Sequence, residues 1–314
     1  MNMLENISLA DKVWFCTGGK ARFFVEPKTA DEFAAAVKFA TEKELAIHML
    51  GLGANTLVSD TGFDGLVIRP ALKTISQQKN GADVFVTAGA GVTIEELINW
   101  GFEHNVVGLE EFSGIPGTIG GSVFINIHYF DCDLSHMVYA AKLMHRKTGE
   151  LIDVDREWFD FKYDYSRLHD EPYVVVEATL KLKVATDIDV AFARGRSVEI
   201  IRHRAHRYPT VRTCGSFFQN FSALTPGLIE LNGKKITAVA YYLDQLGLKG
   251  AVKGKASVST KHANMIVTAP GATSQDVIDV AQHMQQKMRD VYGLTPQPEC
   301  QFVGFSEYPL FLNV

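Results

Sequence analysis

The segment Gly114-Ile-Pro-Gly117-Thr-Ile-Gly120-Gly121 joins a proline–glycine turn to a glycine pair. Glycine accepts positive φ angles and lets backbone N–H groups come close to an anion. We therefore interpret this segment as a compact loop rich in free N–H donors, of the kind that holds a pyrophosphate group. An ordinary turn is the alternative when the segment is considered by itself.

Two more glycine segments precede it, Gly51-Leu-Gly53-Ala-Asn55-Thr-Leu57 and Gly89-Ala-Gly91. The first is not a dinucleotide fingerprint of the Rossmann type, because its third glycine would fall on Thr56. A Walker A loop is absent as well, since Gly233-Lys234 is followed by Lys235. Three glycine segments so close together favour a phosphate-binding role, although composition alone names no ligand.

The length, amino-acid composition and net charge limit the classes of protein to which this chain can belong. A chain of 314 residues suggests two domains, or three small ones, at roughly 100–200 residues per domain. A hydrophobic content of 46% with 21% charged residues is typical of a globular protein and argues against disorder. The net charge of −5 argues against a general nucleic-acid binder.

The sequence also gives expectations about compartment and partners. No apolar run approaches the ~18–20 residues that span a bilayer, and the N-terminus lacks the features of a signal peptide. Four widely spaced cysteines without a C-x-x-C pair predict neither a zinc site nor a disulfide framework. We expect a cytoplasmic protein with no bound metal, no membrane contact and no obligate protein partner. The cysteines are Cys16, Cys132, Cys214 and Cys300.

Three capping boxes predict helices, each beginning after a threonine: Thr29 (helix 29–46), Thr93 and Thr273. In the third helix an apolar stripe is typical of core packing. That stripe comprises Val277, Val280, Ala281, Met284 and Met288.

Strands are predicted at 84–88 and 173–184, and the second alternates strictly between apolar and polar residues. Such alternation indicates a half-solvated sheet face, which favours an α+β protein over a doubly wound one. The residues predicted to share the apolar face are Val174, Val176, Ala178, Leu180, Leu182 and Val184.

A basic stretch between residues 194 and 212 carries six arginines against Glu199 alone, in an otherwise acidic chain. A solvated helix face and a site for an anionic ligand such as a diphosphate are the two interpretations. His203 and His206 within it are interpreted as surface or phosphate contacts, with a metal pair as the alternative.

Motifs distributed in order along the chain resemble those of the UDP-N-acetylenolpyruvoylglucosamine reductase (MurB) family of flavoenzymes. They run from about residue 17 to 304, and it is their collinear order that makes the resemblance specific. The matching segments are Gly51–Ile68; Ala88–Val92 with Gly108–Glu110, Ser113–Gly121 and Asn126; Gly215–Asn220; Gly254–Ser259 with His262-Ala263; and Pro298-Glu299.

The resemblance implies an α+β fold with a two-subdomain FAD-binding region of the MurB, vanillyl-alcohol-oxidase-like (PCMH) type, and a third α+β subdomain that binds substrate. The implied boundaries are 1–70 and 71–200 for the FAD-binding subdomains, 201–303 for the substrate domain, and 304–314 for a tail that returns to the first subdomain. The short segment from 184 to 194 resembles the family's shorter variant.

The resemblance also implies reduction of UDP-N-acetylglucosamine enolpyruvate to UDP-N-acetylmuramate, with FAD and NADPH as cofactors. Ser216 matches the family's proton donor and Glu299 its acidic catalytic residue. The matching substrate-binding positions are Tyr163, Arg212, Gln219, Asn220, Ser259 and His262. The matching cofactor-binding positions are Gly51, Gly53, Ala54, Asn55, Thr56, Gly89, Gly91, Ser113, Gly114, Ile115, Pro116, Gly117, Thr118, Gly120, Gly121 and Asn126.

Three departures from the family pattern bear on the substrate. Asp164 stands where the family has an arginine that supports the enolate, and Arg167 is a candidate to replace that charge. Gln219 replaces a lysine, with Arg207 and Arg212 nearby as compensation. The third departure is the loop Asn126-Ile-His-Tyr-Phe-Asp131, which is bulkier than the family's and brings His128 toward the flavin.

Two alternatives to this function follow from these departures. One is a flavin oxidoreductase of the same fold that acts on another substrate. The other is a protein that binds FAD or a nucleotide sugar without catalysis.

Overall fold

The computed structural model describes residues 2–312. Within that range the chain divides into two compact units. Unit 1 comprises 2–6, 22–52 and 64–204, and unit 2 comprises 7–21, 53–63 and 205–312. The finer division into three subdomains and a tail stays a prediction.

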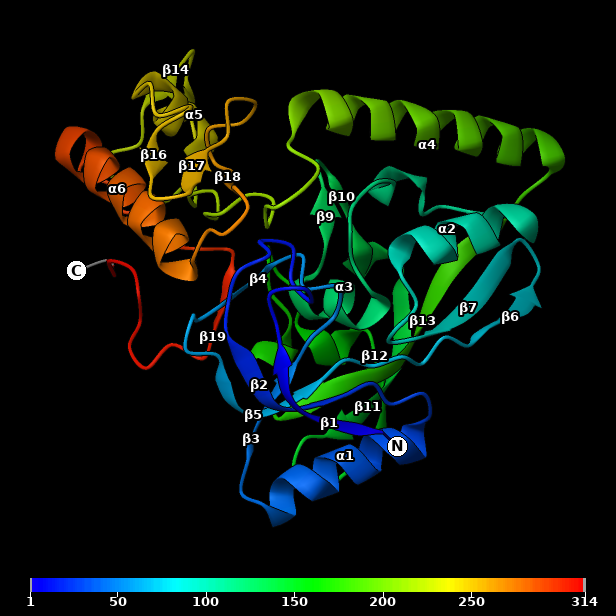
Figure 1. Cartoon of the computed structure of the whole chain (residues 1–314). Helices are drawn as coiled ribbons and strands as arrows, with labels where there is room; N and C mark the ends of the chain where they lie inside the picture. Colours follow the sequence, from blue (N-terminus) through cyan, green and yellow to red (C-terminus); the bar gives the residue numbers. More distant parts are fainter. Residues whose placement is uncertain (1, 313–314) are drawn as a thin grey trace. The chain divides into compact units, whose positions relative to one another are not determined.

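Unit 1 contains an antiparallel sheet in which the strands lie side by side (Figure 1). The predicted strands 84–88 and 173–184 are both confirmed within it. In sheet order the strands are β12 (Leu151–Asp155), β11 (Val138–His145), β13 (Tyr173–Val184), β7 (Asp83–Gly89) and β6 (Ile75–Asn80), with β8 (Val106–Val107) also paired to β13.

The long strand β13 does not keep one apolar face. Between β11 and β13 the register shifts from the pair Lys142–Glu177 to the pair Leu143–Val175. Such a bulge changes which side of the sheet the following residues face. Val174 and Val176 therefore pack into a different core from Ala178, Leu180 and Leu182. The prediction of a single face was wrong for these two valines, and Val184, at the end of the strand, is exposed.

A smaller sheet of unit 1 has the order β1 (Met3–Ser8), β2 (Lys20–Val25), β5 (Phe63–Ile68), β3 (Ala46–Met49). Helix α1 (Ala30–Glu42) begins at the predicted cap Thr29 but ends four residues before the predicted position 46. The chain leaves the helix there because Ala46 starts β3, which pairs in parallel with β5.

Three further helices and several short elements complete unit 1. Helix α2 (Ile94–Glu103) has the predicted capping box, in which Thr93 and Glu96 each bond the other's backbone. The remaining elements are α3 (Ile119–Ile125), α4 (Asp187–Arg207, which runs into unit 2), β9 (His128–Tyr129), β10 (Cys132–Asp133), and the 3-10 helices η1 (Glu110–Phe112), η2 (Leu134–His136), η3 (Glu157–Phe159) and η4 (Arg167–His169).

Unit 2 is built around helix α6 (Ser274–Tyr292), which lies against β16, β17 and β18 (Figure 1). Its capping box at Thr273 is confirmed, and all five residues of the predicted stripe are buried in the core of this unit. The other elements are α5 (Val239–Gln245), β16 (Val252–Lys253), β17 (Ala256–Val258), β18 (Ile266–Thr268), the hairpin of β14 (Glu230–Leu231) and β15 (Lys234–Lys235), and the parallel pair β4 (Thr56–Val58) and β19 (Gln301–Val303).

Within residues 2–312 no helix combines the length and the apolar character that crossing a membrane requires. The four cysteines are free thiols, and no group of three or more potential metal ligands occurs in this range.

Candidate active site

The loop from Gly51 to Asn55 presents five consecutive backbone N–H groups that donate to no acceptor within residues 2–312. Its carbonyl groups are used instead: Arg69 Nε donates to the Gly51 oxygen at 2.9 Å and Trp14 N to the Gly53 oxygen at 3.0 Å. Backbone groups need partners, and a run of open donors is a site for an anion. This loop fits a pyrophosphate group.

The second glycine loop has its N–H groups already occupied. Gly89 N donates to the Thr74 carbonyl and Gly91 N to the Leu72 carbonyl. A Cβ atom on Gly89 would lie 2.4 Å from the Leu72 oxygen, so glycine is required there by the close approach of two backbones.

In the second half of the third glycine segment, the backbone N–H groups are also occupied. Ile119 N donates to the Val92 carbonyl, Gly120 N to the Ala90 carbonyl, and Gly121 N to Thr118 Oγ1. The prediction that this segment is rich in free donors was wrong there. Its glycines serve close packing, with Gly120 placed against Ala90.

Two buried side-chain atoms remain open beside these loops. Asn55 Oδ1 and Ser122 Oγ are shielded from solvent and bond to no group within residues 2–312. Buried polar atoms of this kind call for a ligand or water partner. Ser122 was missed by sequence reasoning, although it directly follows the Gly120-Gly121 pair. In addition, a Cβ on Gly51 would lie 2.8 Å from Thr118 Oγ1, so the first and third segments touch. The residues of unit 1 among them, Gly51, Thr118 and Ser122, fit FAD.

Two other predicted cofactor residues use their polar groups within the protein. Ser113 Oγ lies 2.7 Å from Ser197 Oγ. Asn126, which is 3% exposed, donates from Nδ2 to the Lys162 carbonyl at 3.0 Å and accepts at Oδ1 from Ser135 N at 2.9 Å. Their direct contact with a cofactor stays a prediction.

Segments 124–128 and 162–166 of unit 1 are joined at three points. Besides the bond from Asn126, Ser166 Oγ donates to the Phe124 carbonyl at 2.6 Å. The third point is His128 Nδ1, which lies 3.4 Å from Asp164 Oδ1. Two of the three departures from the family pattern, the altered loop and Asp164, are therefore in contact with one another.

Arg167, the candidate to replace the missing arginine, lies beside Trp158. It starts the 3-10 helix η4, and its guanidinium lies 5.5 Å from the centroid of the Trp158 ring. Its role as a replacement for the family's arginine stays a prediction.

Ser216 and Glu299 are brought together inside unit 2. Glu299 N donates to the Phe217 carbonyl at 2.9 Å, Phe218 pairs with Pro298, and Gln219 N donates to the Gln297 carbonyl at 2.9 Å. The two segments thus run antiparallel, and the two predicted catalytic residues flank one hydrogen bond. Both side chains are half-buried.

Asn264 holds the segment that carries Ser216 in this antiparallel pairing. Sequence reasoning missed this residue. It is 2% exposed, accepts from Phe218 N at Oδ1 (3.1 Å) and donates from Nδ2 to the Phe218 carbonyl (2.8 Å). The backbone carbonyl of Asn264 also accepts from Phe217 N at 2.8 Å. The only sequence signal was its place directly after the matching His262-Ala263 pair.

Some predicted substrate residues have roles inside the protein. Arg212 donates from Nε to the Thr268 carbonyl and from Nη2 to the Ala269 carbonyl, at 3.0 and 3.1 Å. Asn220 Oδ1 accepts from Val239 N at the start of α5, and Ser259 Oγ accepts from Lys261 N. Substrate contacts by these residues stay a prediction.

His262 lies edge-on to Tyr208, and its Nδ1 is buried and has no hydrogen-bond partner within residues 2–312. Burial, together with the positive charges of Arg207 and Lys249, lowers the pKa of His262 from its usual 6.5 to about 4. This imidazole is neutral at physiological pH.

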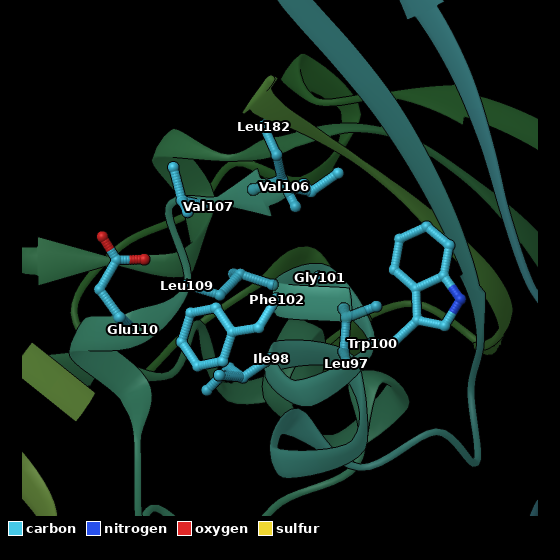
Figure 2. A pocket seen from close by; sticks show the side chains of 10 residues that line it. All are labelled: Leu97, Ile98, Trp100, Gly101, Phe102, Val106, Val107, Leu109, Glu110 and Leu182. Atoms are coloured by element: carbon cyan, nitrogen blue, oxygen red, sulfur yellow. The ribbon is translucent and has the colours of Figure 1, made fainter. Parts of the chain in front are cut away.

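An apolar pocket lies elsewhere in unit 1, between side chains of α2 and those around β8, with the Glu110 carboxylate at one side (Figure 2). Glu110 Oε2 accepts from Gly108 N at 2.7 Å, so this carboxylate is already hydrogen-bonded to the neighbouring backbone. None of the predicted site residues lines this pocket.

Proteins of a known family resemble this chain over nearly its whole length. Residues 206–303 match the C-terminal domain of UDP-N-acetylenolpyruvoylglucosamine reductase, and residues 21–155 match an FAD binding domain. The reductase of Caldicellulosiruptor saccharolyticus is 30% identical over 99% of this chain and 95% of its own length. That of Pediococcus pentosaceus is 31% identical over 97% and 95%.

The chain belongs to the UDP-N-acetylenolpyruvoylglucosamine reductase family.

A solved structure supports the same assignment. The crystal structure of this reductase from Thermus caldophilus superimposes with a TM-score of 0.76 at 25% identity, covering 96% of this chain and 98% of that one. The α+β fold of the MurB type, expected from the resemblance, is confirmed. As a member of the reductase family with an FAD-binding domain, the protein is a flavin-dependent oxidoreductase.

Proposed function

We propose that the protein reduces UDP-N-acetylenolpyruvoylglucosamine to UDP-N-acetylmuramate with NADPH, as a single enzyme of peptidoglycan synthesis in the cytoplasm. The observation that carries this proposal is the hydrogen bond from Glu299 N to the Phe217 carbonyl, because it sets Ser216 beside Glu299. Family membership supports the substrate and the cofactors.

Within unit 1, Gly51, Leu52, Thr118 and Ser122 would hold FAD, the first two through open backbone N–H groups and Ser122 through its buried hydroxyl. Bound FAD supplies the transfer of two electrons from NADPH to the enolpyruvyl double bond. The protein's own task is then to stabilise negative charge at the substrate carboxylate and to deliver a proton to the α-carbon.

Ser216 is the proposed donor of that proton. A serine hydroxyl is a weak acid, but a strongly basic carbon centre takes its proton when the oxygen is held within hydrogen-bond reach. The backbone bonds at Phe217 and Phe218 hold the main chain that carries this hydroxyl. Glu299, one residue across the antiparallel pair, is proposed to assist through its carboxyl group.

A second candidate function is a flavin reductase for another substrate. The observation that favours it is the buried carboxylate of Asp164 at the position where the family has a cation. Steady-state NADPH oxidation with and without UDP-N-acetylenolpyruvoylglucosamine separates the two, because only the first function gives oxidation that depends on this substrate.

The role of Ser216 is tested by stopped-flow measurement of the two half-reactions in Ser216→Ala. We expect flavin reduction by NADPH to stay within about threefold of wild type. Reoxidation by the substrate should fall at least a hundredfold, within the range for removal of an acid catalyst. Ser222→Ala, at an exposed serine in the same region, is the control. Equal loss in both half-reactions of Ser216→Ala would contradict the proton-donor role.

A further inference from the structure

Helix α4 lies at the surface of unit 1 (Figure 1) and presents two rows of side chains on opposite sides. Steps of three and four residues separate the members of each row, which is the spacing of a helix face that packs against another structure. The inner row is buried and consists of Val190, Ala193, Ser197 and Ile200. The outer row is exposed along its whole length and consists of Ile188, Phe192, Gly195, Glu199 and Arg202.

Large apolar side chains of this outer face are open to solvent. Phe192 is 75% exposed and Ile188 69%, and Val198, which adjoins the row, is 55% exposed. Single exposed apolar residues are common on protein surfaces, but a row of them on one helix face indicates an interaction surface. In the middle of the row Gly195 weakens the helix, although a Cβ there would meet no atom of residues 2–312 within 4 Å. Packing within the chain therefore does not explain this glycine, whereas the close approach of a second backbone does.

Charge is distributed unevenly along α4. Residues 187–193 contain two aspartates and no basic residue, whereas residues 194–204 contain four arginines against Glu199 alone. The outer row carries Phe192 in the acidic half and Arg202 in the basic half. An antiparallel pair of such helices opposes the acidic half of each to the basic half of the other, and it also opposes the two helix dipoles. A parallel pair would bring the two basic halves together.

We propose that the outer face of α4 binds a second copy of this chain, with the two α4 helices antiparallel. A two-fold axis near residue 197 sets Phe192 of one protomer against the partner's Arg202, and Gly195 against the partner's Glu199. A guanidinium over a phenyl ring is a favourable contact, and the glycine leaves room for the facing side chain. The steps of three and four residues suit helices that cross at about 20°. This association is independent of the proposed function.

An anionic membrane surface is the other partner that an apolar and basic helix fits. The carboxylates of α4 oppose that partner, because anionic headgroups repel the exposed Asp187, Asp189 and Glu199. The basic charge is also partly neutralised within unit 1, where Arg196 Nε lies 2.7 Å from a carboxylate oxygen of Glu111. The charges of α4 complement a second α4 better than they complement an anionic surface.

Sedimentation velocity of the full-length holoprotein over a range of concentrations tests this pairing. One pair of helices buries less than the roughly 1,200 Å² of a standard interface, so we expect a weak dimer with a Kd of about 10–100 µM. The weight-average mass should rise from that of one chain at low concentration toward that of two chains at high concentration.

Two single variants and their combination test the antiparallel register. Phe192→Lys sets two cations against each other and Arg202→Glu removes the cation beside the ring, so each should raise the Kd about tenfold or more. The double variant Phe192→Lys/Arg202→Glu restores opposite charges across the interface and should recover part of the lost affinity, which a folding defect would not do. Val291→Lys, at a 59% exposed valine of α6, is the control and should leave the Kd unchanged.

Three results would overturn the inference. The first is a wild-type protein that stays monomeric at about 200 µM. The second is a dimer whose Kd changes in neither single variant, because such a dimer uses another surface. The third is a monomer that co-sediments with phosphatidylglycerol vesicles and loses this binding in Arg202→Glu, which would identify an anionic membrane surface as the partner.

Discussion

Asn55 and Glu299 lie 244 positions apart in the sequence and are joined by a hydrogen bond of 3.1 Å, from Asn55 Nδ2 to the Glu299 carbonyl. Gln301 N donates to the Asn55 carbonyl at 3.0 Å, where β19 begins its parallel pairing with β4. The glycine loop that fits the FAD pyrophosphate is therefore attached to the segment that carries the predicted acidic residue. We therefore expect cofactor binding and the position of Glu299 to be coupled through the Asn55 side chain.

Asn55→Ala should weaken both functions of that side chain. Loss of one hydrogen bond should lower the free energy of unfolding by about 1 kcal/mol. Because Asn55 Oδ1 is buried with no hydrogen-bond partner within residues 2–312 and is thus open to a ligand, FAD affinity, measured by fluorescence titration of the apoprotein, should fall about tenfold. Asn80→Ala, at an exposed asparagine of β6, is the control. Unchanged FAD affinity in Asn55→Ala would argue against a role of this loop in binding FAD.

Asn264→Ala should be among the most damaging changes in unit 2. It removes two hydrogen bonds to Phe218 and leaves a buried N–H and a buried carbonyl without partners. The expected loss is about 2–4 kcal/mol in the free energy of unfolding. Urea denaturation measures this loss, and stopped-flow reoxidation should show a reduced rate because the Ser216 backbone loses its support. Stability within 0.5 kcal/mol of wild type would show that Asn264 is dispensable.

Two glycine-to-alanine changes should act in opposite directions. Gly89→Ala places a Cβ 2.4 Å from the Leu72 carbonyl oxygen, so the backbones must separate at a cost of at least about 2 kcal/mol. Gly195→Ala, in α4, meets no atom within 4 Å and should stabilise the protein by about 0.5–1 kcal/mol through its helix propensity. Thermal unfolding of the two variants measures the contrast, and a Gly89→Ala variant as stable as wild type would contradict the packing argument.

Acid should destabilise the protein through His262. Its pKa is about 4 in the folded protein and near 6.5 in the unfolded chain, so the unfolded chain binds an extra proton between these values. The stability that the neutral imidazole contributes is complete above pH 6.5 and is lost as pH falls toward 4, by roughly 1–3 kcal/mol. His262→Gln should flatten this part of the pH dependence, measured by chemical denaturation at several pH values. His48, whose pKa burial also lowers to about 4, is present in both proteins and cancels in the comparison.

Local patterns in the sequence predicted the regular elements well. The caps at Thr29, Thr93 and Thr273 and the alternation in β13 depend on neighbours a few residues away, and all four elements are present. The end of α1 and the bulge in β13 were not predictable, because each is set by a strand that is distant in the sequence.

For the site, too, local sequence patterns predicted some features, while others depend on contacts between distant residues. Motif order identified Ser216, Glu299 and the glycine segments, but it could not tell which glycine segment keeps its N–H groups open. That depends on whether another stretch of backbone supplies acceptors. Thr74 and Leu72 do so for the second segment, and in the part of the chain that the structure describes none does so for residues 51–55. Asn264 and Ser122 were missed because a buried asparagine or serine looks like any other in a sequence.

The sequence by itself determined the family, the α+β class and the residue types available for flavin chemistry, since these depend on motif identity and short-range periodicity. Only the tertiary structure decided how those residues are used. It placed His128 against Asp164, turned Arg167 to Trp158 and set Asn55 on the Glu299 segment. The physical reason is that charge pairing and hydrogen bonding act over a few ångströms in space, between residues whose separation along the chain carries no signal of their contact.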